Sequence, residues 1–153
     1  MNTPARVTIL LLIAGVLGAV ANLVSPHRIA WREDWARHVE TAANAAGMPL
    51  VTLAETQAIV AKGTHILLDA RSLDAYAAGH LPGAMSLPAD AMEQQFPQFA
   101  GVLDANSPLL VYCSGIECDE SLRLGTFLHE QGFTNVVLFA AGYAAWSAET
   151  AAP

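Results

Sequence analysis

Short apolar runs alternate with helix-like patterns along the chain from Pro49 to Thr150. Three runs are continuous rather than alternating, which is typical of strands buried on both faces of a sheet: Ile66–Leu68, Leu109–Tyr112 and Val136–Phe139. Segments bounded by glycine, proline or capping residues predict helices over residues 52–60, 73–78, 89–103 (with a break at Pro97), 120–131 and 142–146. Strands and helices in this alternation predict an α/β domain, with a parallel sheet and helices on both of its faces.

The N-terminal end of the chain has a different pattern. Val7 to Val24 holds 18 residues without a charge, and a helix of that length spans roughly 27 Å, enough to cross the hydrocarbon core of a membrane. A cleaved signal peptide is the alternative, with Ala19–Ala21 as its small-residue cleavage site. We favour a retained anchor because the run is longer than the usual apolar region of a signal peptide. The predicted organisation is a tail (1–6), an anchor or signal segment (7–24), a juxtamembrane helix or linker (25–48) and a globular domain (49–150).

The side of the membrane on which the domain lies depends on two opposed features. Arg6 precedes the apolar segment, whereas Arg28, Arg32 and Arg37 follow it, and this excess favours a cytoplasmic domain. A very short N-terminal tail, like a signal peptide, favours export instead. We expect a single-pass membrane protein with its domain on the extracytoplasmic (periplasmic) side.

Residues 31–47 predict a helix between the anchor and the domain, ended by Gly47. Trp31 and Trp35 share one face of this helix, and Arg32 and Arg37 could meet lipid headgroups. A plain connecting helix that packs on the domain is equally compatible with the pattern.

Charge and cysteine content narrow the possible functions. The whole chain has a net charge of −7, and residues 49–153 hold three basic against eleven acidic residues. Such a domain repels polyanions, so we expect no nucleic-acid partner. The chain contains two cysteines, too few for a disulfide framework, so they are candidates for chemistry rather than for architecture.

Cys113 directly follows a predicted strand and precedes a predicted helix, which is where α/β folds bind ligands. A cysteine attacks as its thiolate, and an unperturbed thiol is mostly protonated at neutral pH. A loop curling around the sulfur could stabilise the thiolate with backbone N–H groups and the positive end of the following helix. The residues predicted to form this cradle are Ser114, Gly115, Ile116, Glu117 and Cys118.

Three motifs carry a resemblance to a known family. DARSLDAYAAGHLPGAMSLP (69–88), VYCSGIECDES (111–121) and FAAGYAAW (139–146) resemble, in order and spacing, the signatures of the rhodanese-like sulfurtransferases. The resemblance covers roughly residues 50–148 and implies a rhodanese-like fold. It also implies that Cys113 takes up a sulfane sulfur as a persulfide and passes it to a thiol or another nucleophile, with no cofactor. The partners implied are a small-molecule or protein sulfur donor and a thiol acceptor.

Cys118 departs from the pattern of many relatives, which carry a basic residue near this end of the loop. Here Cys118 is flanked by Glu117, Asp119 and Glu120. These acids oppose thiolate formation and repel anions, so we expect thiosulfate to be a poor donor. Two interpretations of Cys118 stay open: a resolving or relay thiol, or a small residue that fills the loop.

The remaining polar residues of the motifs favour structural roles. Asp69 and Arg71 are expected to form a supporting ion pair, and His80 to bond backbone in a turn. Cys113 and Cys118 lie outside the common spacing of zinc ligands, so no metal site with His80 or His129 is expected.

Three other functions compete with sulfur transfer. Phosphatases and arsenate reductases use a related loop closed by arginine, whereas this loop reaches Asp119, so that class is excluded. A thiol–disulfide oxidoreductase would use Cys118 to resolve an intermediate on Cys113. A redox-sensing binding module would use Cys113 and Cys118 without turning over a substrate. The sequence does not identify the physiological sulfur donor or acceptor. It also does not decide whether residues 1–21 are cleaved, or what the oligomeric state is.

Overall fold

The computed structural model describes residues 3–25, 35–99 and 101–151. Two units divide the chain between Glu33 and Asp34. The first contains helix α1 (Thr3–Val24), and the second contains every other described helix and strand.

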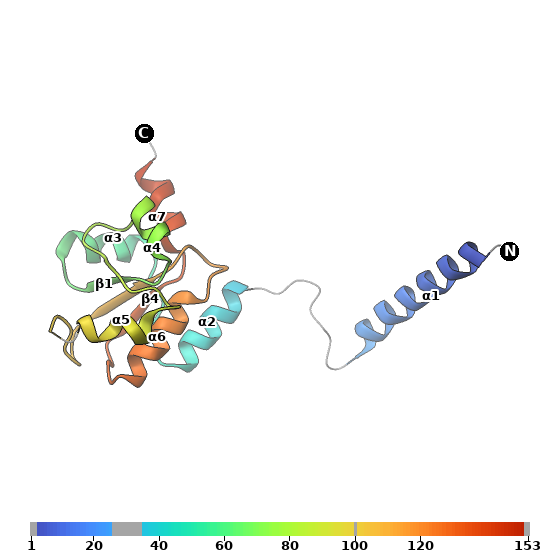
Figure 1. The fold of residues 1–153 in the computed structure, drawn as a ribbon, viewed down its shortest axis with the longest axis horizontal. Coiled ribbons are helices and arrows are strands. Elements are labelled where there is room, and N and C mark those ends of the chain that lie inside the picture. The colour runs from blue at the N-terminus through green and yellow to red at the C-terminus, as the bar shows by residue number, and fades with distance from the viewer. Residues whose placement is uncertain (1–2, 26–34, 100, 152–153) are drawn as a thin grey trace. The chain divides into compact units, whose positions relative to one another are not determined.

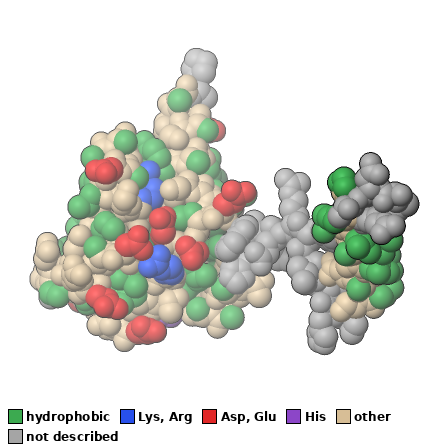
Figure 2. Space-filling view, turned by 45° about the vertical axis from the view of Figure 1, so that its right-hand side comes forward, with side chains coloured by type: hydrophobic (Ala, Val, Ile, Leu, Met, Phe, Trp, Pro, Cys, Tyr) green, Lys and Arg blue, Asp and Glu red, His purple; other side chains and the backbone are tan. Residues whose placement is uncertain are grey.

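Helix α1 begins four residues before the predicted anchor, so part of the predicted tail is helical. Pro4 is compatible with this start because the first turn of a helix needs no N–H from it. Val7–Val24 has a mean hydropathy of 2.5, and the helix is long and apolar enough to cross a membrane. Its large apolar side chains are exposed, Leu11 by 68%, and hydrophobic side chains dominate the described part of this helix in Figure 2. Cleavage and membrane orientation stay predictions.

The second unit is built on a four-stranded parallel sheet in the order β2-β1-β3-β4. The strands are β1 (Ile66–Asp69), β2 (Met85–Ser86), β3 (Leu109–Tyr112) and β4 (Val136–Phe139). Three of them confirm the strands predicted from continuous apolar runs. The sequence did not predict β2, because two residues carry no periodicity and pairing of Leu68 with Met85 defines the strand.

Helices cover both faces of the sheet, as predicted (Figure 1). One face packs α2, α5 and α6 over Leu68, Leu109 and Val111. The other packs α3, α4 and α7 over Leu67 and Leu110. The bounds of these helices are α2 (Trp35–Ala45), α3 (Leu53–Lys62), α4 (Leu73–Ala78), α5 (Met92–Gln95), α6 (Glu120–Glu130) and α7 (Gly142–Thr150).

Helix α2 lies within residues 25–48, the predicted juxtamembrane helix or linker. Val39, Ala43 and Met48 are buried, the latter two in the same core cluster as Leu124 of α6. The helix ends at Ala45, and two residues later Gly47 has a φ of +72° and the N–H of Met48 bonds to the carbonyl of Ala43. The connecting helix therefore packs on the domain, and the globular unit begins before residue 49. The predicted contacts of Trp31, Arg32, Trp35 and Arg37 with lipid concern side chains outside those described.

Residues 89–103, predicted to be helical with a break at Pro97, are helical over a shorter range than predicted. The chain forms α5 and a 3₁₀ turn, η1 (Phe96–Phe99), in that region. Pro97 has no N–H and its ring would clash with the carbonyl four residues earlier in a continued α-helix. The chain therefore tightens into a 3₁₀ turn at the position where the sequence predicted a break.

Most other boundaries agree with the prediction. Thr52 and Glu55 form the predicted capping box at the start of α3, and Gly63 ends that helix with φ +61°. Helix α7 runs four residues beyond the predicted end at Trp146. Its last residues carry no apolar pattern that would have predicted the extension.

The order of the strands creates a binding position. From β1 the chain crosses to β2 on one side, and from β3 it crosses to β4 on the other, while β1 and β3 are direct neighbours. Ligands of open parallel sheets bind where the connections diverge in this way, beyond the carboxyl ends of the strands. Asp69 at the end of β1 and Cys113 directly after β3 therefore lie at the switch point of this sheet.

Candidate active site

Cys113 is fully buried. It begins the loop that connects β3 to α6. The fold positions it because the last residue of β3, Tyr112, is paired on both sides, with Asp69 of β1 and Phe139 of β4. The sulfur thus follows a strand that is paired on both sides, while the loop of residues 113–119 is exposed at four of its seven residues.

The start of α7 holds the first part of this loop. The N–H of Tyr143 donates to the carbonyl of Cys113 at 2.8 Å, and the N–H of Ala144 donates to the carbonyl of Ser114 at 2.9 Å. These donors belong to the first turn of α7 and have no partner within the helix. Gly142 makes the approach possible, because its φ is +62° and an added Cβ would lie 2.6 Å from the amide nitrogen of Gly115. The third predicted motif therefore positions the second.

Cys113 and Cys118 are joined by a disulfide, with their Cα atoms 6.4 Å apart. This separation lies within the range that a disulfide requires. The hydroxyl of Ser121, a fully buried residue in the first turn of α6, lies 3.5 Å from the sulfur of Cys113 and can donate to it. The two cysteines therefore face each other across the loop rather than pointing apart.

The disulfide form does not contain the predicted cradle of N–H groups. The carbonyl oxygens of Gly115 and Cys118 lie 3.6 and 3.4 Å from the sulfur of Cys113. Within the described loop no backbone N–H bonds to that sulfur, and the N–H of Cys118 bonds to the carbonyl of Gly115. A cradle around a thiolate or persulfide requires the loop to open after reduction, so for the reduced form it stays a prediction.

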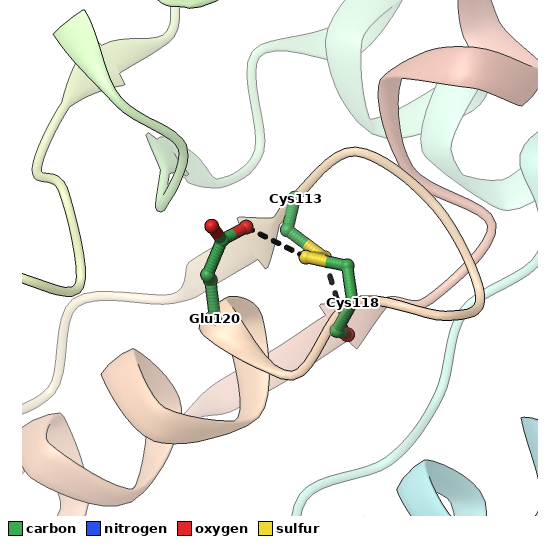
Figure 3. A group of neighbouring side chains, drawn as sticks. All are labelled: Cys113, Cys118 and Glu120. Carbon is green, nitrogen blue, oxygen red and sulfur yellow. Dashed lines mark hydrogen bonds between the residues drawn. A yellow bond between two sulfur atoms is a disulfide. The ribbon is translucent and has the colours of Figure 1, made fainter. Parts of the chain in front are cut away.

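Glu120, at the start of α6, points toward Cys118 (Figure 3). Its Oε2 lies 2.7 Å from the Cys118 sulfur, so the thiol of a reduced Cys118 could donate to this carboxylate. Burial raises the pKa of Glu120, and the charges of Asp90 and Asp119 raise it further, while Arg123 partly opposes them. The carboxylate is therefore a better proton acceptor than an exposed glutamate.

A cavity of about 640 Å³ lies against the outer side of the loop. Glu117 is the only residue lining it that carries a charge, and the wall contributed by α7 and the turn before it consists of alanines. The lining residues are Ser114, Gly115, Ile116, Glu117, Cys118, Ala141, Ala144 and Ala145. All five residues predicted to cradle the sulfur line this cavity, whereas buried Cys113 lies behind Cys118.

Asp69 and Arg71 form the predicted ion pair at the end of β1, and both side chains have further hydrogen-bond partners. Arg71 Nη2 lies 2.6 Å from Asp69 Oδ2, and the same nitrogen donates to the carbonyl of Gly79. The Tyr112 hydroxyl donates to Asp69 at 2.7 Å and accepts from the N–H of Leu81. Burial and the bond to Asp69 raise the pKa of Tyr112. Burial lowers the pKa of Arg71, but its bonds to Asp69 more than offset this.

His80 bonds to backbone, as predicted. Its Nδ1 lies 3.0 Å from the carbonyl of Tyr76, and the two rings stack with centroids 3.9 Å apart. The sulfurs of Cys113 and Cys118 and an oxygen of Glu120 lie within 4.8 Å of one another. A disulfide offers no thiolate to a metal ion, so the expectation that the site uses no metal stays a prediction for the reduced form.

Three residues of the site were not singled out from the sequence, and Glu120 was noted only for its charge beside Cys118. Ser121 was seen only as part of a helix start, and Tyr112 only as the end of a strand. Gly142 could have been found, since a glycine within the motif FAAGYAAW at a helix start indicates close backbone approach. The contacts of Glu120 with Cys118 and of Tyr112 with Asp69 depend on tertiary packing.

Known proteins share this arrangement of strand, loop and helix. Residues 52–149 match the rhodanese-like domain family. The thiosulfate sulfurtransferase GlpE of Haemophilus influenzae is 37% identical over 82 residues, which are 53% of this chain and 71% of the relative. The human thiosulfate:glutathione sulfurtransferase is 28% identical over 115 residues, covering 66% of this chain and 95% of the relative.

Similarity to solved structures agrees with this assignment. The human single-domain sulfurtransferase TSTD1 superposes with a TM-score of 0.58 at 25% identity, covering 66% of this chain and 96% of that structure. A rhodanese-like domain from Anabaena gives a TM-score of 0.55 at 26% identity, covering 66% of this chain and 74% of that one. Helices α1 and α2 precede the matched region. From residue 52 to residue 149 the chain belongs to the rhodanese-like domain family, and its relatives support sulfur transfer as its general activity.

Proposed function

We propose that the chain is a sulfurtransferase that carries a sulfane sulfur as a persulfide on Cys113 and passes it to a thiol or another nucleophile. The observation that carries this proposal is the position of Cys113, which directly follows β3 at the switch point of the sheet. In its reduced form Cys113 can receive a hydrogen bond from the buried hydroxyl of Ser121, which favours the charged sulfur.

Replacing Cys113 with serine tests the proposal directly. We expect Cys113→Ser to gain no sulfur atom by intact mass after incubation with a persulfide donor, and to release no thiocyanate from cyanide. The fold should be retained, because serine is nearly isosteric with cysteine, and circular dichroism checks this. Cys118→Ala is the matched control, since it should still gain one sulfur on Cys113. Persulfide on Cys113→Ser would contradict the proposal, whereas disulfide exchange without any sulfur uptake in the parent would favour the oxidoreductase.

We also propose that an uncharged or singly charged persulfide is a better donor than thiosulfate. Thiosulfate is named as the substrate of the relatives, but the cavity beside this loop has only one charged residue, the acid Glu117. Alanines and Ile116 form much of the remaining wall. An anion with two charges would be repelled there, and nothing basic in the lining compensates.

The apolar helix α1 supports a membrane tether, and we propose that the domain it tethers is exported. Protease added to intact spheroplasts should digest a domain on the outer side, whereas protection until the membrane is broken would place it in the cytoplasm. An N-terminal epitope tag that stays with the membrane fraction distinguishes a retained anchor from a cleaved signal peptide. Both assays should use the chain with α1 present, because the predicted membrane tether depends on this helix.

A further inference from the structure

We propose that Cys118 is a resolving cysteine, which discharges the persulfide on Cys113 and releases its sulfur as hydrogen sulfide. This inference depends on the proposed persulfide on Cys113. It adds a second activity, reductive release of sulfide, to sulfur transfer.

The geometry supports attack of one sulfur on the other. The two cysteines are bonded across the loop with a Cα separation of 6.4 Å, so the chain can bring Cys118 to Cys113 without unfolding the sheet. Cys113 is fully buried directly after β3, whereas Cys118 is half-buried in the loop. The sulfur that is attacked is thus held at the end of a strand, and the attacking sulfur comes from the loop.

The reaction balances without an additional oxidant. The thiolate of Cys118 forms a bond to the inner sulfur of the Cys113 persulfide, and the bond between the inner and outer sulfurs breaks. The outer sulfur leaves with the electron pair as hydrogen sulfide. It is thereby reduced from the sulfane to the sulfide state, while the two cysteines are oxidised to the disulfide.

Glu120 supplies the proton acceptor for this step. Its Oε2 lies 2.7 Å from the sulfur of Cys118, so it can take the thiol proton as Cys118 attacks. No other carboxylate among the described residues contacts either sulfur. The charges that face Glu120 are those of Asp90, Asp119, Asp69 and Arg123.

The cavity shows where electrons enter to restore the thiols. In the disulfide form Cys118 lines the cavity, while Cys113 is fully buried. An external dithiol therefore reaches Cys118 first and leaves Cys113 as the departing thiolate, next to the hydroxyl of Ser121. A dithiol protein, or dithiothreitol in solution, supplies the two electrons that each cycle consumes.

A single-turnover experiment tests the proposal on the full chain in detergent. The protein is reduced with dithiothreitol, desalted, loaded with glutathione persulfide and desalted again, and sulfide is then measured over time without added thiol. We expect the parent to release about one sulfide per loaded Cys113 while its intact mass shifts to that of the disulfide. Cys118→Ala should keep the added sulfur.

The outcomes separate this inference from the proposed function. If Cys118→Ala loads normally and releases sulfide as fast as the parent, Cys118 does not resolve the persulfide. If the parent retains the sulfur with a free Cys118 thiol, the inference is equally overturned, although transfer through Cys113 stands. If neither protein takes up sulfur, the proposed function itself fails.

Glu120→Gln tests the proton acceptor. We expect discharge to slow by about a hundredfold, and the loss of rate seen in the parent as pH falls through the pKa of Glu120 should disappear. Glu149→Gln is the matched control, because Glu149 is an exposed residue of α7 that does not line the cavity. An unchanged rate and an unchanged pH profile in Glu120→Gln would exclude Glu120 as the base.

Discussion

The ends of the two neighbouring strands β1 and β3 use charge differently. At the end of β1, the buried carboxylate of Asp69 is paired with Arg71 and also accepts from Tyr112. At the end of β3, the sulfurs of Cys113 and Cys118 lie beside the carboxylate of Glu120, and no basic residue lines the adjoining cavity. Arg71 is the basic residue nearest to the switch point in sequence. Its side chain is bound to Asp69 and to the carbonyl of Gly79.

This difference explains how one edge of a sheet can be both rigid and reactive. A buried charge network with every partner present holds one arrangement, because breaking any bond leaves an unpaired buried charge. A loop without such a network can change its bonding when its cysteines are reduced. The first strand end therefore fixes the position of the second, and the second carries the cysteine for which we propose sulfur transfer.

The largest effect is expected from breaking the network at β1. Arg71→Met should destabilise the fold by about 3–5 kcal/mol, because the Asp69 carboxylate, which has no exposed surface, loses its cation. Thermal and urea unfolding of the full chain in detergent measure this. Combining it with Asp69→Asn should recover part of the loss. Exposed Lys62→Met is the control and should change stability by less than about 0.5 kcal/mol; an equally small effect of Arg71→Met would show that the pair is not a stabilising network.

A second prediction separates loop position from backbone strain. Gly142→Ala should slow sulfur uptake by Cys113 about a hundredfold, because the added Cβ displaces the loop at Gly115. Gly63→Ala is the control, since its φ of +61° is nearly the same and nothing lies within 4 Å of its added Cβ. It should cost about 1–2 kcal/mol of stability without slowing uptake. Equal uptake rates in the two variants would show that α7 does not position the loop.

A third prediction concerns the missing cation at the end of β3. Glu117→Gln combined with Asp119→Asn should increase thiosulfate turnover about two- to tenfold, because two exposed charges that repel the anion are removed. The increase should shrink at high salt, where exposed charges are screened. Turnover with an uncharged alkyl persulfide should be unchanged, and Glu149→Gln should change neither. Efficient, salt-independent use of thiosulfate by the parent would contradict the repulsion.

The smallest effect is a dependence of stability on pH. Since the pKa of Glu120 is raised above its usual value of 4.5, mainly by burial, its ionisation is less favourable in the folded than in the unfolded state. The parent should therefore lose stability relative to Glu120→Gln as pH rises from below 4.5 through the raised pKa. Melting temperatures of the two proteins between acid and neutral pH check this. A parent that gains stability relative to Glu120→Gln over that range would reverse the sign.

Much of the fold could be predicted because its signals are local. Continuous apolar runs predicted β3 and β4 at their observed bounds and β1 to within one residue, and the pair Thr52 and Glu55 predicted the start of α3. The sequence missed an element, or left its packing open, where a neighbour decides the structure. Strand β2 exists because Met85 and Ser86 pair with β1, and α2 belongs to the domain because Val39 and Ala43 are buried there.

The sequence by itself determined the class of the protein and led to the residue for which we propose the central role. A cysteine between a buried strand and a helix, in three motifs of known order, led to the rhodanese-like family and to Cys113. These features depend on neighbouring residues and can be read without knowing what packs against them. The long apolar run at the N-terminus is of the same kind, because helix length and hydropathy are properties of a single segment.

Only the tertiary structure decided what surrounds the sulfur. The approach of Gly142 to the loop, the buried contacts of Tyr112 and Ser121 with Asp69 and Cys113, and the facing of Cys118 by Glu120 all depend on packing. The sequence placed two cysteines five residues apart, but that spacing allows many distances between their side chains. The sheet fixes one end of the loop and α6 fixes the other, and this brings the two sulfurs together.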